Sequence, residues 1–385
     1  MSRARHQVVV VGAGLVGAAT ALALARQGLR VALIERRPPD VPDATWDTRI
    51  YAISPASQRF LERLGAWQKM DAARIQPIYR MEVAGDGHGA VRLDAYEAGV
   101  SHLASIVESG RLQDALWRTI EADGSVAVHC PAAIDALDRG EDSTRVTLAD
   151  GTVLEADLVV GADGAASRIR DWAGLAAEVT PYERSGVVAN FDCERPHHGT
   201  AFQWFSGSDV LAWLPLPGNR VSIVWSTEMA SAAALLALPA SELAEKVRAA
   251  GGDRLGALRL LTPPAAFPLR LIRVESPIAP GVALVGDAAH GVHPLAGQGV
   301  NLGFGDAEAL VAVLAQHRRA SPGDPALLRR YARARAEPVA RIQGVTHGLH
   351  HLFAAPRAQW LRNAGMDLVD HLPPLKAALI REAMS

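Results

Sequence analysis

One stretch of this 385-residue chain decides its fold: Val8-Val9-Val10-Val11-Gly12-Ala13-Gly14-Leu15-Val16-Gly17. The four valines predict a short strand that is buried on both faces of a sheet. Gly12 allows a tight turn out of that strand, Gly14 lets a pyrophosphate approach a backbone without a Cβ, and Gly17 lets the next helix pack closely on the sheet. The stretch therefore predicts a strand–turn–helix unit that binds a dinucleotide, with the phosphates at the positive end of the helix dipole.

The residues after this stretch complete a βαβ unit. The Ala/Leu-rich segment from Leu15 to Gln27 predicts a helix, and Gly28 follows it as a helix-ending residue. The apolar segment from Val31 to Glu35 predicts the next strand, parallel to the first. Glu35 then lies at the end of this strand, where a carboxylate accepts hydrogen bonds from the ribose hydroxyls of an adenine dinucleotide.

A competing interpretation of the N-terminus is a signal peptide or a membrane span. Residues 8–25 carry no charge, and Arg3 and Arg5 precede them. The three spaced glycines and the second strand-like segment, from Arg30 to Glu35, argue against this interpretation. We therefore favour a buried strand, a turn and a helix.

The composition is typical of a globular chain with two domains. Of the residues, 49% are hydrophobic and 21% are charged, and the formal net charge is −2. A chain of this length exceeds one ordinary hydrophobic core. The charge balance argues against a nucleic-acid partner, because such proteins usually carry a clustered basic excess.

The cysteines argue against a disulfide scaffold and against a metal site. There are two, Cys130 and Cys193, and they lie far apart in the sequence. Cys193 is followed by His197 and His198 at a spacing that suits a metal, but no second pair of ligands accompanies them. We interpret this segment as a polar loop, expect no metal, and expect a reducing cytoplasm as the location.

Patterns along the rest of the chain alternate between a parallel-sheet type and a β-rich type. Helices are predicted from Ser54 to Leu64, Arg111 to Glu121, Ser241 to Ala250, Ala307 to Gln316 and Pro325 to Met384. Hairpin strands are predicted from Val126 to Val153, and further strands at Ala156 to Gly161, Val210 to Leu214, Arg220 to Trp225 and Val282 to Val285. We therefore expect an α/β fold in which a nucleotide-binding domain is interrupted by a sheet-based domain.

A second motif follows the predicted strand that ends at Gly161. Asp163-Gly164 forms its turn, and Ser167 and Arg170 lie at the start of the next helix. Taken alone, this motif is a strand, a turn and a helix with a capping residue.

A third motif begins at the predicted strand from Val282 to Val285. Asp287 follows this strand, where a carboxylate can reach a ribityl hydroxyl. Gly297 and Gly299 open a loop into a helix, whose free N–H groups can stabilise negative charge at the pyrimidine end of a flavin. A loop with only a packing role would not explain the clustered glycines together with Asn301 and two flanking aspartates.

In this order and spacing, the three motifs resemble those of the class A flavoprotein monooxygenases, typified by para-hydroxybenzoate hydroxylase. The run HPLAGQGVNLGFGD, residues 293–306, is similar to the signature of the ubiquinone-biosynthesis hydroxylase family. Three further segments share that resemblance: Asp47 to Ser54, Leu214 to Pro217 with Val224 to Ser226, and Arg362 to Gly365. It covers essentially the whole chain and implies a Rossmann-like FAD-binding domain (1–75, 100–180 and 271–325), an inserted β-sheet substrate domain (76–99 and 181–270) and C-terminal helices (326–385).

The resemblance implies an FAD site built from all three motifs. The residues expected at the ADP half are Gly12, Gly14, Leu15, Val16, Gly17, Glu35 and Arg36. Those expected near the flavin, its ribityl chain or the phosphates are Arg49, Arg111, Asp163, Gly164, Asp287, Pro294, Gly297, Gly299, Val300 and Asn301.

The resemblance also implies hydroxylation of an electron-rich phenol by the C4a-hydroperoxide that reduced FAD forms with O2. NAD(P)H or another reductase would donate the electrons, since the sequence shows no separate nicotinamide-binding domain. His293 and Pro294, beside the flavin loop, are the candidate catalytic residues. For His293 both an activating role and a structural hydrogen bond are open, and Tyr182 is a further candidate base.

Tryptophans of the predicted β domain are candidates for a substrate pocket that holds a prenylated ring: Trp204, Trp213 and Trp225. Core packing is the competing role for all three. The stretch from Leu349 to Met384 mixes apolar and basic residues, which suits packing on the FAD-binding domain or, alternatively, contact with a membrane surface or a partner.

Three functions are compatible with these patterns. The first is hydroxylation of a polyprenylphenol in ubiquinone biosynthesis, by a cytoplasmic protein associated peripherally with a membrane or with a biosynthetic complex. The second is hydroxylation of a small soluble aromatic compound, and the third is a flavin-bearing scaffold without activity. The complete glycine motifs argue against the scaffold, and the run from residue 293 to 306 favours the first function. The ring carbon and the oligomeric state stay open.

Overall fold

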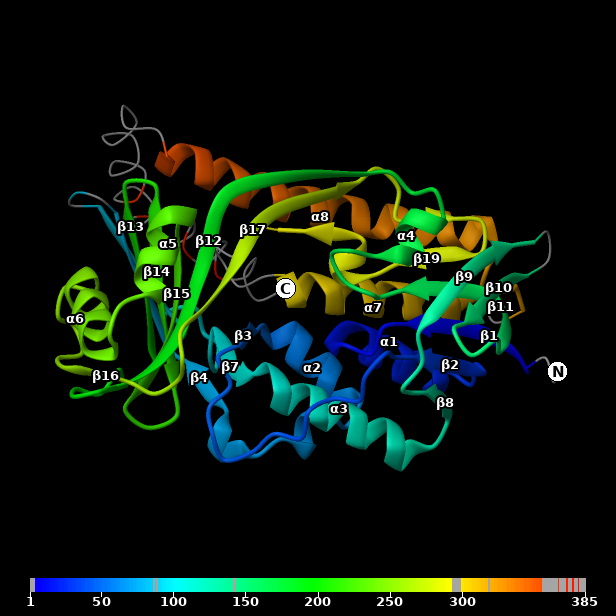
Figure 1. Ribbon diagram of the computed structural model, residues 1–385, viewed down its shortest axis with the longest axis horizontal. Helices are drawn as coiled ribbons and strands as arrows, with labels where there is room; N and C mark the ends of the chain where they lie inside the picture. Colours follow the sequence, from blue (N-terminus) through cyan, green and yellow to red (C-terminus); the bar gives the residue numbers. More distant parts are fainter. Residues whose placement is uncertain are drawn as a thin grey trace.

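Two large sheets organise the chain (Figure 1). The computed structural model describes residues 4–85, 87, 89–140, 143–292, 299–317 and 319–354, together with Met366, Leu372, Lys376 and Ile380. These residues form an eight-stranded, a nine-stranded and a three-stranded sheet. The predicted α/β fold class is confirmed. Among the described residues, no helix combines the length and the apolar composition that crossing a bilayer requires.

The first sheet has the parallel core that the N-terminal βαβ unit predicts. Its five parallel strands lie in the order β19, β11, β1, β2, β8, so β1 is central. These strands are β1 (Ala4–Val11), β2 (Val31–Ile34), β8 (Val126–His129), β11 (Val153–Gly161) and β19 (Val282–Leu284). Antiparallel strands extend it: β9 (Ile134–Arg139), β10 (Thr144–Leu148) and β18 (Ile278–Ala279).

Helices cover one face of this sheet, and the resulting core contains the alternate valines Val8 and Val10 of β1. The helices that contribute to this core are α1 (Leu15–Arg26), α2 (Pro55–Arg63), α3 (Ser109–Asp123), α7 (Gly299–Gln316) and α8 (Pro325–Ala354). Val9 and Val11 face the other side, where α4 (Arg168–Trp172) and the β9–β10 hairpin complete a second core. The four valines are therefore buried on both faces, as their sequence predicts.

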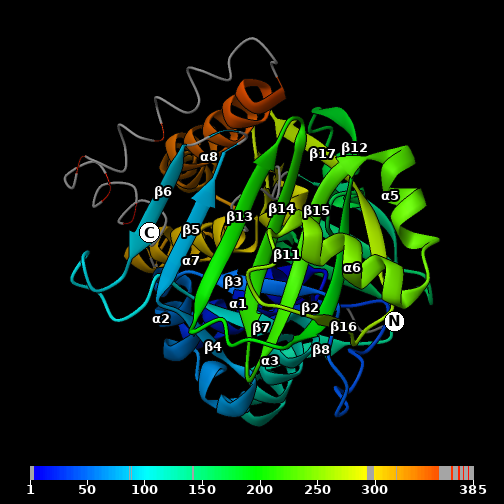
Figure 2. The same ribbon diagram turned by 90° about the vertical axis from the view of Figure 1, so that its left-hand side faces the viewer.

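The second sheet has the order β20, β17, β12, β15, β14, β13, β5, β6, and β16 pairs with β12. Its strands are β5 (Arg80–Ala84), β6 (Ala90–Asp94), β12 (Ala177–Cys193), β13 (Thr200–Ser206), β14 (Asp209–Leu216), β15 (Arg220–Glu228), β16 (Leu258–Leu260), β17 (Ala265–Val274) and β20 (His290–Gly291). Helices α5 (Met229–Leu236) and α6 (Ala240–Ala250) pack on its outer face (Figure 2).

A small sheet lies against the inner face of the second sheet. It consists of β3 (Ile50–Ile53), β4 (Gln76–Ile78) and β7 (Ala104–Glu108). Ile78 and Ile106 from this sheet share an apolar cluster with Ala201 and Leu216 of the large sheet. This cluster joins the two halves of the molecule beside the segment that contains Arg49.

Strands β12 and β17 run as long neighbours from the second sheet to the dinucleotide-binding side (Figure 1). Their pairing shifts register between Pro181 and Ser185, and Glu183 has a positive φ of 54°. This irregularity lies at the domain boundary expected at residue 181. Both strands nevertheless extend across the boundaries expected at residues 181 and 271, so the two parts share these strands.

Several elements differ from their sequence predictions, among them β8, α7 and α5. Strand β8 lies in the predicted hairpin region but pairs in parallel with β2, because Val126 packs into the helix-covered core at this edge of the sheet. Helix α7 begins at Gly299, eight residues before the predicted start, because its glycines allow close packing: a Cβ on Gly303 would lie 2.6 Å from Val16. Helix α5 was not predicted, since its alanine-rich sequence has little amphipathic pattern.

Three short 3-10 turns complete the described elements: η1 (Trp67–Lys69), η2 (Ala72–Arg74) and η3 (Gly286–Ala288).

Candidate active site

The turn between β1 and α1 assigns different roles to its three glycines. Gly12 has a φ of 98°, and a Cβ there would lie 2.4 Å from the carbonyl oxygen of Ala162. A Cβ on Gly17 would lie 1.9 Å from the carbonyl oxygen of Gly12. A Cβ on Gly14, by contrast, would meet no protein atom within 4 Å. Packing therefore requires Gly12 and Gly17, whereas Gly14 faces open space at the N-terminus of α1.

The first turn of α1 presents its backbone rather than its side chains to this space. Leu15 is buried in the core below the sheet. The Val16 side chain packs toward Gly286 and Gly303, where added Cβ atoms would approach it to 3.4 Å and 2.6 Å. Gly14, the N-cap residue, makes no side-chain cap, so the amides of this turn are available to an anion.

Glu35 is held rigidly at the end of β2. Its Oε2 accepts a hydrogen bond from the Ala13 amide at 2.7 Å. Its Oε1 accepts from the amides of Arg36, at 2.7 Å, and Arg37, at 3.2 Å. The carboxylate thus lies directly beside the glycine turn, and the Arg36 side chain is exposed.

A buried carboxylate, Glu108, organises the segment that leads to Arg49. Glu108 is 2% exposed. Arg74 donates to both of its oxygens at 2.7 Å, and Arg111 Nε donates to Oε2 at 2.9 Å. The Asp47 amide donates to Oε1 at 2.8 Å. Four donors therefore converge on this one carboxylate and fix it in place.

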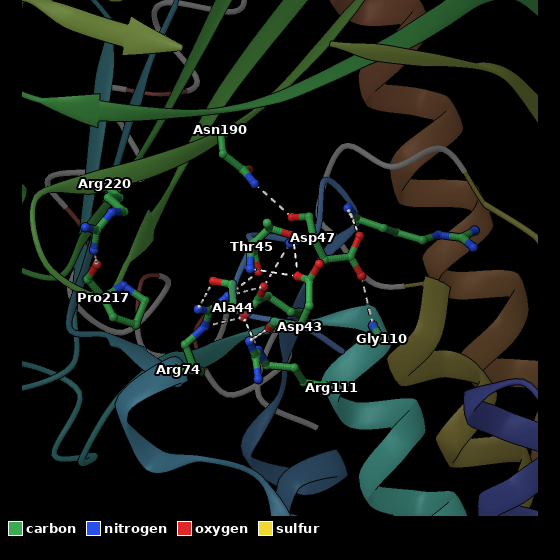
Figure 3. A network of polar contacts seen from close by, with 12 residues as sticks. Asp43, Ala44, Thr45, Asp47, Arg74, Gly110, Arg111, Asn190, Pro217 and Arg220 are labelled. Atoms are coloured by element: carbon green, nitrogen blue, oxygen red, sulfur yellow. Dashed lines mark hydrogen bonds and ion pairs between the residues drawn. The ribbon is translucent and has the colours of Figure 1, made fainter. Parts of the chain in front are cut away.

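The same two arginines also hold the backbone of the preceding loop. Arg111 Nη2 donates to the Asp43 carbonyl at 2.6 Å. Arg74 donates to the carbonyls of Ala44, at 3.2 Å, and Thr45, at 2.9 Å. Figure 3 shows both guanidinium groups directed into this loop. The structure therefore places Arg111 in contact with Glu108 and the loop.

Asp47 connects this loop to two other elements. Its Oδ1 accepts from the Arg49 amide at 2.8 Å, and its Oδ2 accepts from the Gly110 amide, in the first turn of α3, at 2.9 Å. Its carbonyl accepts from Asn190 Nδ2 of β12 at 2.8 Å (Figure 3). The orientation of Arg49 thus depends on α3 and on the inner face of the large sheet.

Arg49 and Asp287 lie near each other around Tyr51, a residue that sequence reasoning did not single out. The Arg49 guanidinium carbon lies 5.9 Å from the centroid of the Tyr51 ring. Burial raises the pKa of Tyr51, and the charges of Arg49 and Asp287 both act on its phenol. Strand β3 and turn η3 thus bring Arg49, expected near the phosphates, toward Asp287, expected at the ribityl chain.

Asp287 is accessible to solvent although protein atoms crowd around it. This crowding raises the pKa of its carboxyl, while His290 and Arg49 act in the opposite direction. The Asp287 carboxylate is thus both crowded by protein atoms and accessible to solvent. A group of this kind, destabilised in its charged form, is typical of binding sites.

The pKa of Asp287 leads to a prediction about the apoprotein. A raised carboxyl pKa means that the folded state loses stability as the pH rises from the ordinary value of 3.8 through the raised value. The Asp287→Asn variant does not undergo this loss, so at pH 7 it should unfold at a higher temperature than the parent. The difference should shrink as the pH falls below 4. Thermal unfolding of both apoproteins between pH 3.5 and 8 measures it, and an equal difference at all pH values would contradict the prediction.

Asp163 binds the first turn of α4, whose N-cap residue is Ser167. Asp163 accepts hydrogen bonds from the Ser167 hydroxyl and from the amides of Arg168, at 2.7 Å, and Ile169, at 3.2 Å. Gly164 has a φ of 84°. The described contacts of the Asp163 carboxylate therefore serve α4, which is the capping role that the motif suggests when taken alone.

Asn301 joins the N-terminus of α7 to β3. Its Oδ1 accepts from the Ser54 amide at 2.9 Å, and its Nδ2 donates to the Ala52 carbonyl at 2.8 Å. Gly299 and Val300 are the first residues of the helix. The expected site residues His293, Pro294 and Gly297 lie outside the described residues.

The structure does not bring the three predicted substrate tryptophans to these turns. Trp213 is fully buried in the core under α5 and α6, and a Cβ on Gly251 would lie 2.1 Å from its ring. Trp225 and Trp204 pack against the same core, on the outer face of the sheet. Trp225 Nε1 donates to Asp209 at 3.3 Å, and Trp204 lines a surface pocket of about 430 Å³ at the edge near β5 and β6. All three tryptophans therefore lie on the face of the sheet that α5 and α6 cover.

The opposite, inner face of the sheet carries partly exposed apolar side chains: Ala212, Leu214, Val224 and Phe267. Phe267 is 41% exposed and lies opposite Gly186 of β12. The alternation of residues along β14 indicates that the strand has two different faces. Only the position of α5 and α6 shows which of these faces the helices cover.

The predicted polar loop after Cys193 has internal partners. His197 Nε2 contacts the carbonyls of Leu216 and Gly218 at 2.8 Å, and the Gly199 amide donates to His197 Nδ1 at 3.0 Å. Within the described residues, no group of three or more His, Cys, Asp or Glu side chains is arranged to hold a metal ion.

Comparison with known proteins identifies the family. Residues 5–344 match the family model described as an FAD binding domain. The ubiquinone hydroxylase UbiL of Rhodospirillum rubrum is 36% identical over 385 residues, which cover 98% of this chain and 89% of that protein. The 3-demethoxyubiquinol 3-hydroxylase of Escherichia coli is 36% identical over 397 residues, which cover 100% of both chains.

A solved structure shows the same arrangement in three dimensions. The crystal structure of PqsL from Pseudomonas aeruginosa, described as a probable FAD-dependent monooxygenase, superposes with a TM-score of 0.80. It is 25% identical and covers 94% of this chain and 99% of its own. The chain therefore belongs to the FAD binding domain family and, within it, to the flavin monooxygenases that include the ubiquinone-biosynthesis hydroxylases.

Proposed function

We propose that the chain is an FAD-dependent monooxygenase that hydroxylates the ring of a polyprenylated phenol in ubiquinone biosynthesis. The observation that carries this proposal is the full-length relationship, at 36% identity, to two hydroxylases whose names specify ubiquinone and 3-demethoxyubiquinol. The geometry at Gly14, Glu35 and Asp287 supports it, because an open glycine turn, a fixed carboxylate and an accessible carboxylate suit a dinucleotide.

The residues of the site divide among the parts of the cofactor. The amides around Gly14 would bind the pyrophosphate, and Glu35 the adenosine ribose. Asp287 would accept hydrogen bonds from the ribityl chain, and the start of α7 would face the flavin ring. Arg49, whose amide is fixed by Asp47, would supply positive charge to the phosphates.

Arg111 and Asp163 take indirect roles in this proposal. Arg111 binds Glu108 and the Asp43 carbonyl, so it would act on the cofactor by holding the loop that leads to Arg49. Asp163 caps α4 and would hold its turn against the cofactor side. For both residues, the contacts with protein groups support a positioning role.

Bound FAD would supply the redox chemistry, with electrons from NAD(P)H or from a separate reductase. Of the two oxygen atoms of O2, one would enter the ring and the other would leave as water. The chain would contribute orientation and exclusion of water. The inner face of the large sheet, with Leu214, Val224 and Phe267, would hold the apolar part of the substrate. His293 and Pro294 stay the candidates nearest to the reacting ring.

A polyprenylphenol resides in the membrane, so the proposal includes partners beyond the substrate. We expect a cytoplasmic chain that reaches its substrate by peripheral contact with the membrane or within a ubiquinone-biosynthesis complex. The apolar length of the substrate supports this part of the proposal, since each buried CH₂ adds about 0.8 kcal/mol to membrane affinity.

Deletion of the gene tests the proposal. The deletion strain should accumulate a polyprenylphenol that lacks one hydroxyl group and should contain at least tenfold less ubiquinone, as measured by chromatography and mass spectrometry of extracted quinones. The wild-type chain should restore ubiquinone, and a Gly14→Val variant should not. Normal ubiquinone in a deletion strain without a redundant hydroxylase would refute the proposed substrate. Full restoration by a variant that has lost FAD would instead indicate a scaffold.

A further inference from the structure

The turn that carries Asp287 is held by side chains from three separate helices. Tyr331 of α8 donates its hydroxyl to the Leu284 carbonyl at 2.6 Å. Asp306 of α7 accepts from the Gly286 amide at 2.9 Å. On the other side of Asp287, Arg170 of α4 donates to the Ala288 carbonyl at 3.3 Å (the two residues are 118 positions apart). Backbone groups before and after Asp287 are thus each bound by a distant side chain.

All three side chains are buried. Asp306 and Tyr331 are 1% exposed, and Arg170 is 5% exposed. Burial of a polar group costs stability unless it makes hydrogen bonds, and burial of a charge costs more. Two charged groups and a phenol around one turn are therefore an unfavourable arrangement in the absence of such bonds. Apolar side chains of similar size would have packed these helices at least as favourably, so packing alone does not explain them.

Two further side chains, His290 and Arg335, contact the Asp306 carboxylate. His290 Nε2 lies 2.6 Å from Oδ2, and Arg335 Nε donates to Oδ1 at 2.7 Å. Although burial opposes ionisation, His290 and Arg335 together hold the pKa of Asp306 below its ordinary value. Asp306 therefore stays an acceptor for the Gly286 amide at neutral pH.

The turn also has little room to move. Gly286 has a φ of 61°, and a Cβ there would lie 3.4 Å from Val16 of α1. A Cβ on Gly303 of α7 would lie 3.1 Å from the Gly286 Cα. Helices α1 and α7 therefore contact the turn directly. The turn has hydrogen-bonded restraints along its backbone and a steric restraint behind it.

We propose that Asp306, Tyr331 and Arg170 are positioning residues that fix the Asp287 carboxylate for the ribityl chain of FAD; this inference rests on the proposed function. Arg170 extends the restraint, because its Nη2 also donates to the Ala165 carbonyl at 3.2 Å. It thereby links the Asp287 turn to the Asp163-Gly164 turn. Asp306, which ends the signature run, would thus position Asp287, which follows β19 in the same motif.

A double-mutant cycle separates positioning from general stability. Tyr331→Phe removes one hydroxyl and keeps the ring, so it is the mildest of the available changes. In the wild-type background it should weaken FAD binding about tenfold, within the range of coupling between residues that share a network. In an Asp287→Ala background it should have no further effect, because the group that it positions is gone. Fluorescence titration of each apoprotein with FAD gives the four dissociation constants.

Controls make the outcome decisive. Tyr96→Phe removes the hydroxyl of a tyrosine that is 92% exposed, and it should leave FAD affinity unchanged. Asp306→Asn should weaken binding more than Tyr331→Phe. If that variant does not fold, as judged by circular dichroism, the Tyr331→Phe cycle decides alone. Equal losses from Tyr331→Phe in both backgrounds would overturn the inference. A wild-type chain that binds no FAD would refute the proposed function instead.

Discussion

A Gly14→Val variant should unfold at the same temperature as the parent apoprotein and bind FAD about 100-fold more weakly. The folded chain leaves open space where the new side chain would lie, because no protein atom comes within 4 Å of a Cβ at this position. Gly14 has a φ of −64° and a ψ of −175°, which any residue adopts without strain. The valine would therefore occupy only the space that the pyrophosphate needs. Forcing a side chain into a close contact costs about 1–3 kcal/mol, and about 2.7 kcal/mol corresponds to 100-fold.

Gly17→Ala should show the opposite behaviour. Its Cβ would lie 1.9 Å from the Gly12 carbonyl oxygen and 2.9 Å from the Ala162 Cβ. Neither neighbour can move readily, because one is backbone and the other lies at the end of a buried strand. We expect this variant to lose about 3 kcal/mol of unfolding free energy, the upper range for overpacking. Chemical denaturation of the apoprotein measures this loss.

A matched control uses a glycine of α8. A Cβ added to Gly344 would also meet no protein atom within 4 Å, so Gly344→Val should change neither stability nor FAD affinity by much. Loss of stability in Gly14→Val, or unchanged FAD affinity, would show that this glycine does not face the cofactor.

Glu108→Gln should destabilise the fold by about 3 kcal/mol and weaken FAD binding in the fraction that folds. Arg74 and Arg111 both depend on this carboxylate, and their side chains are only 15% and 20% exposed. Removing one partner of a buried ion pair typically costs about 3–5 kcal/mol, because the remaining charge loses its compensation. The amide is nearly isosteric, so the loss reports charge and hydrogen bonding rather than volume. Denaturant unfolding measures the loss, and titration with FAD measures the effect on the loop that leads to Arg49.

The control for this variant is Glu337→Gln on α8. Glu337 also pairs with an arginine, Arg341, at 2.8 Å, but its side chain is 74% exposed. Exposed pairs contribute little to stability, so the unfolding midpoint should not move. If Glu108→Gln behaved like this control, the network in Figure 3 would not stabilise the loop.

Local patterns were sufficient for the parts of the fold that depend on neighbours in sequence. The valine run, the glycine turn and the position of Glu35 were all predicted, because a strand, a tight turn and a helix are specified by spacing over a few residues. The start of α2 is similar: Ser54 caps it by accepting from the Ser57 amide, with Pro55 at its first position.

The structure resolves cases in which two sequence patterns compete. The glycines of the signature run indicated a loop, but tertiary packing extends α7 back to Gly299 because only glycine fits against Val16 and Gly286. The tryptophans of the large sheet were candidates for the substrate pocket. Alternation along a strand defines two faces but does not say which one a helix will cover, and α5 and α6 cover theirs.

By itself, the sequence determined a dinucleotide-binding βαβ unit, an α/β fold and membership of a flavin monooxygenase family, because these depend on short-range spacing and on motifs that stay together in the chain. Only the tertiary structure decided that Glu108 accepts hydrogen bonds from Arg74 and Arg111. It also decided that Asp306 binds the Gly286 amide, next to Asp287 in the chain. These contacts join residues far apart in the sequence. Their physical basis is the burial of charge, which requires partners that only the packed helices and sheets bring within reach.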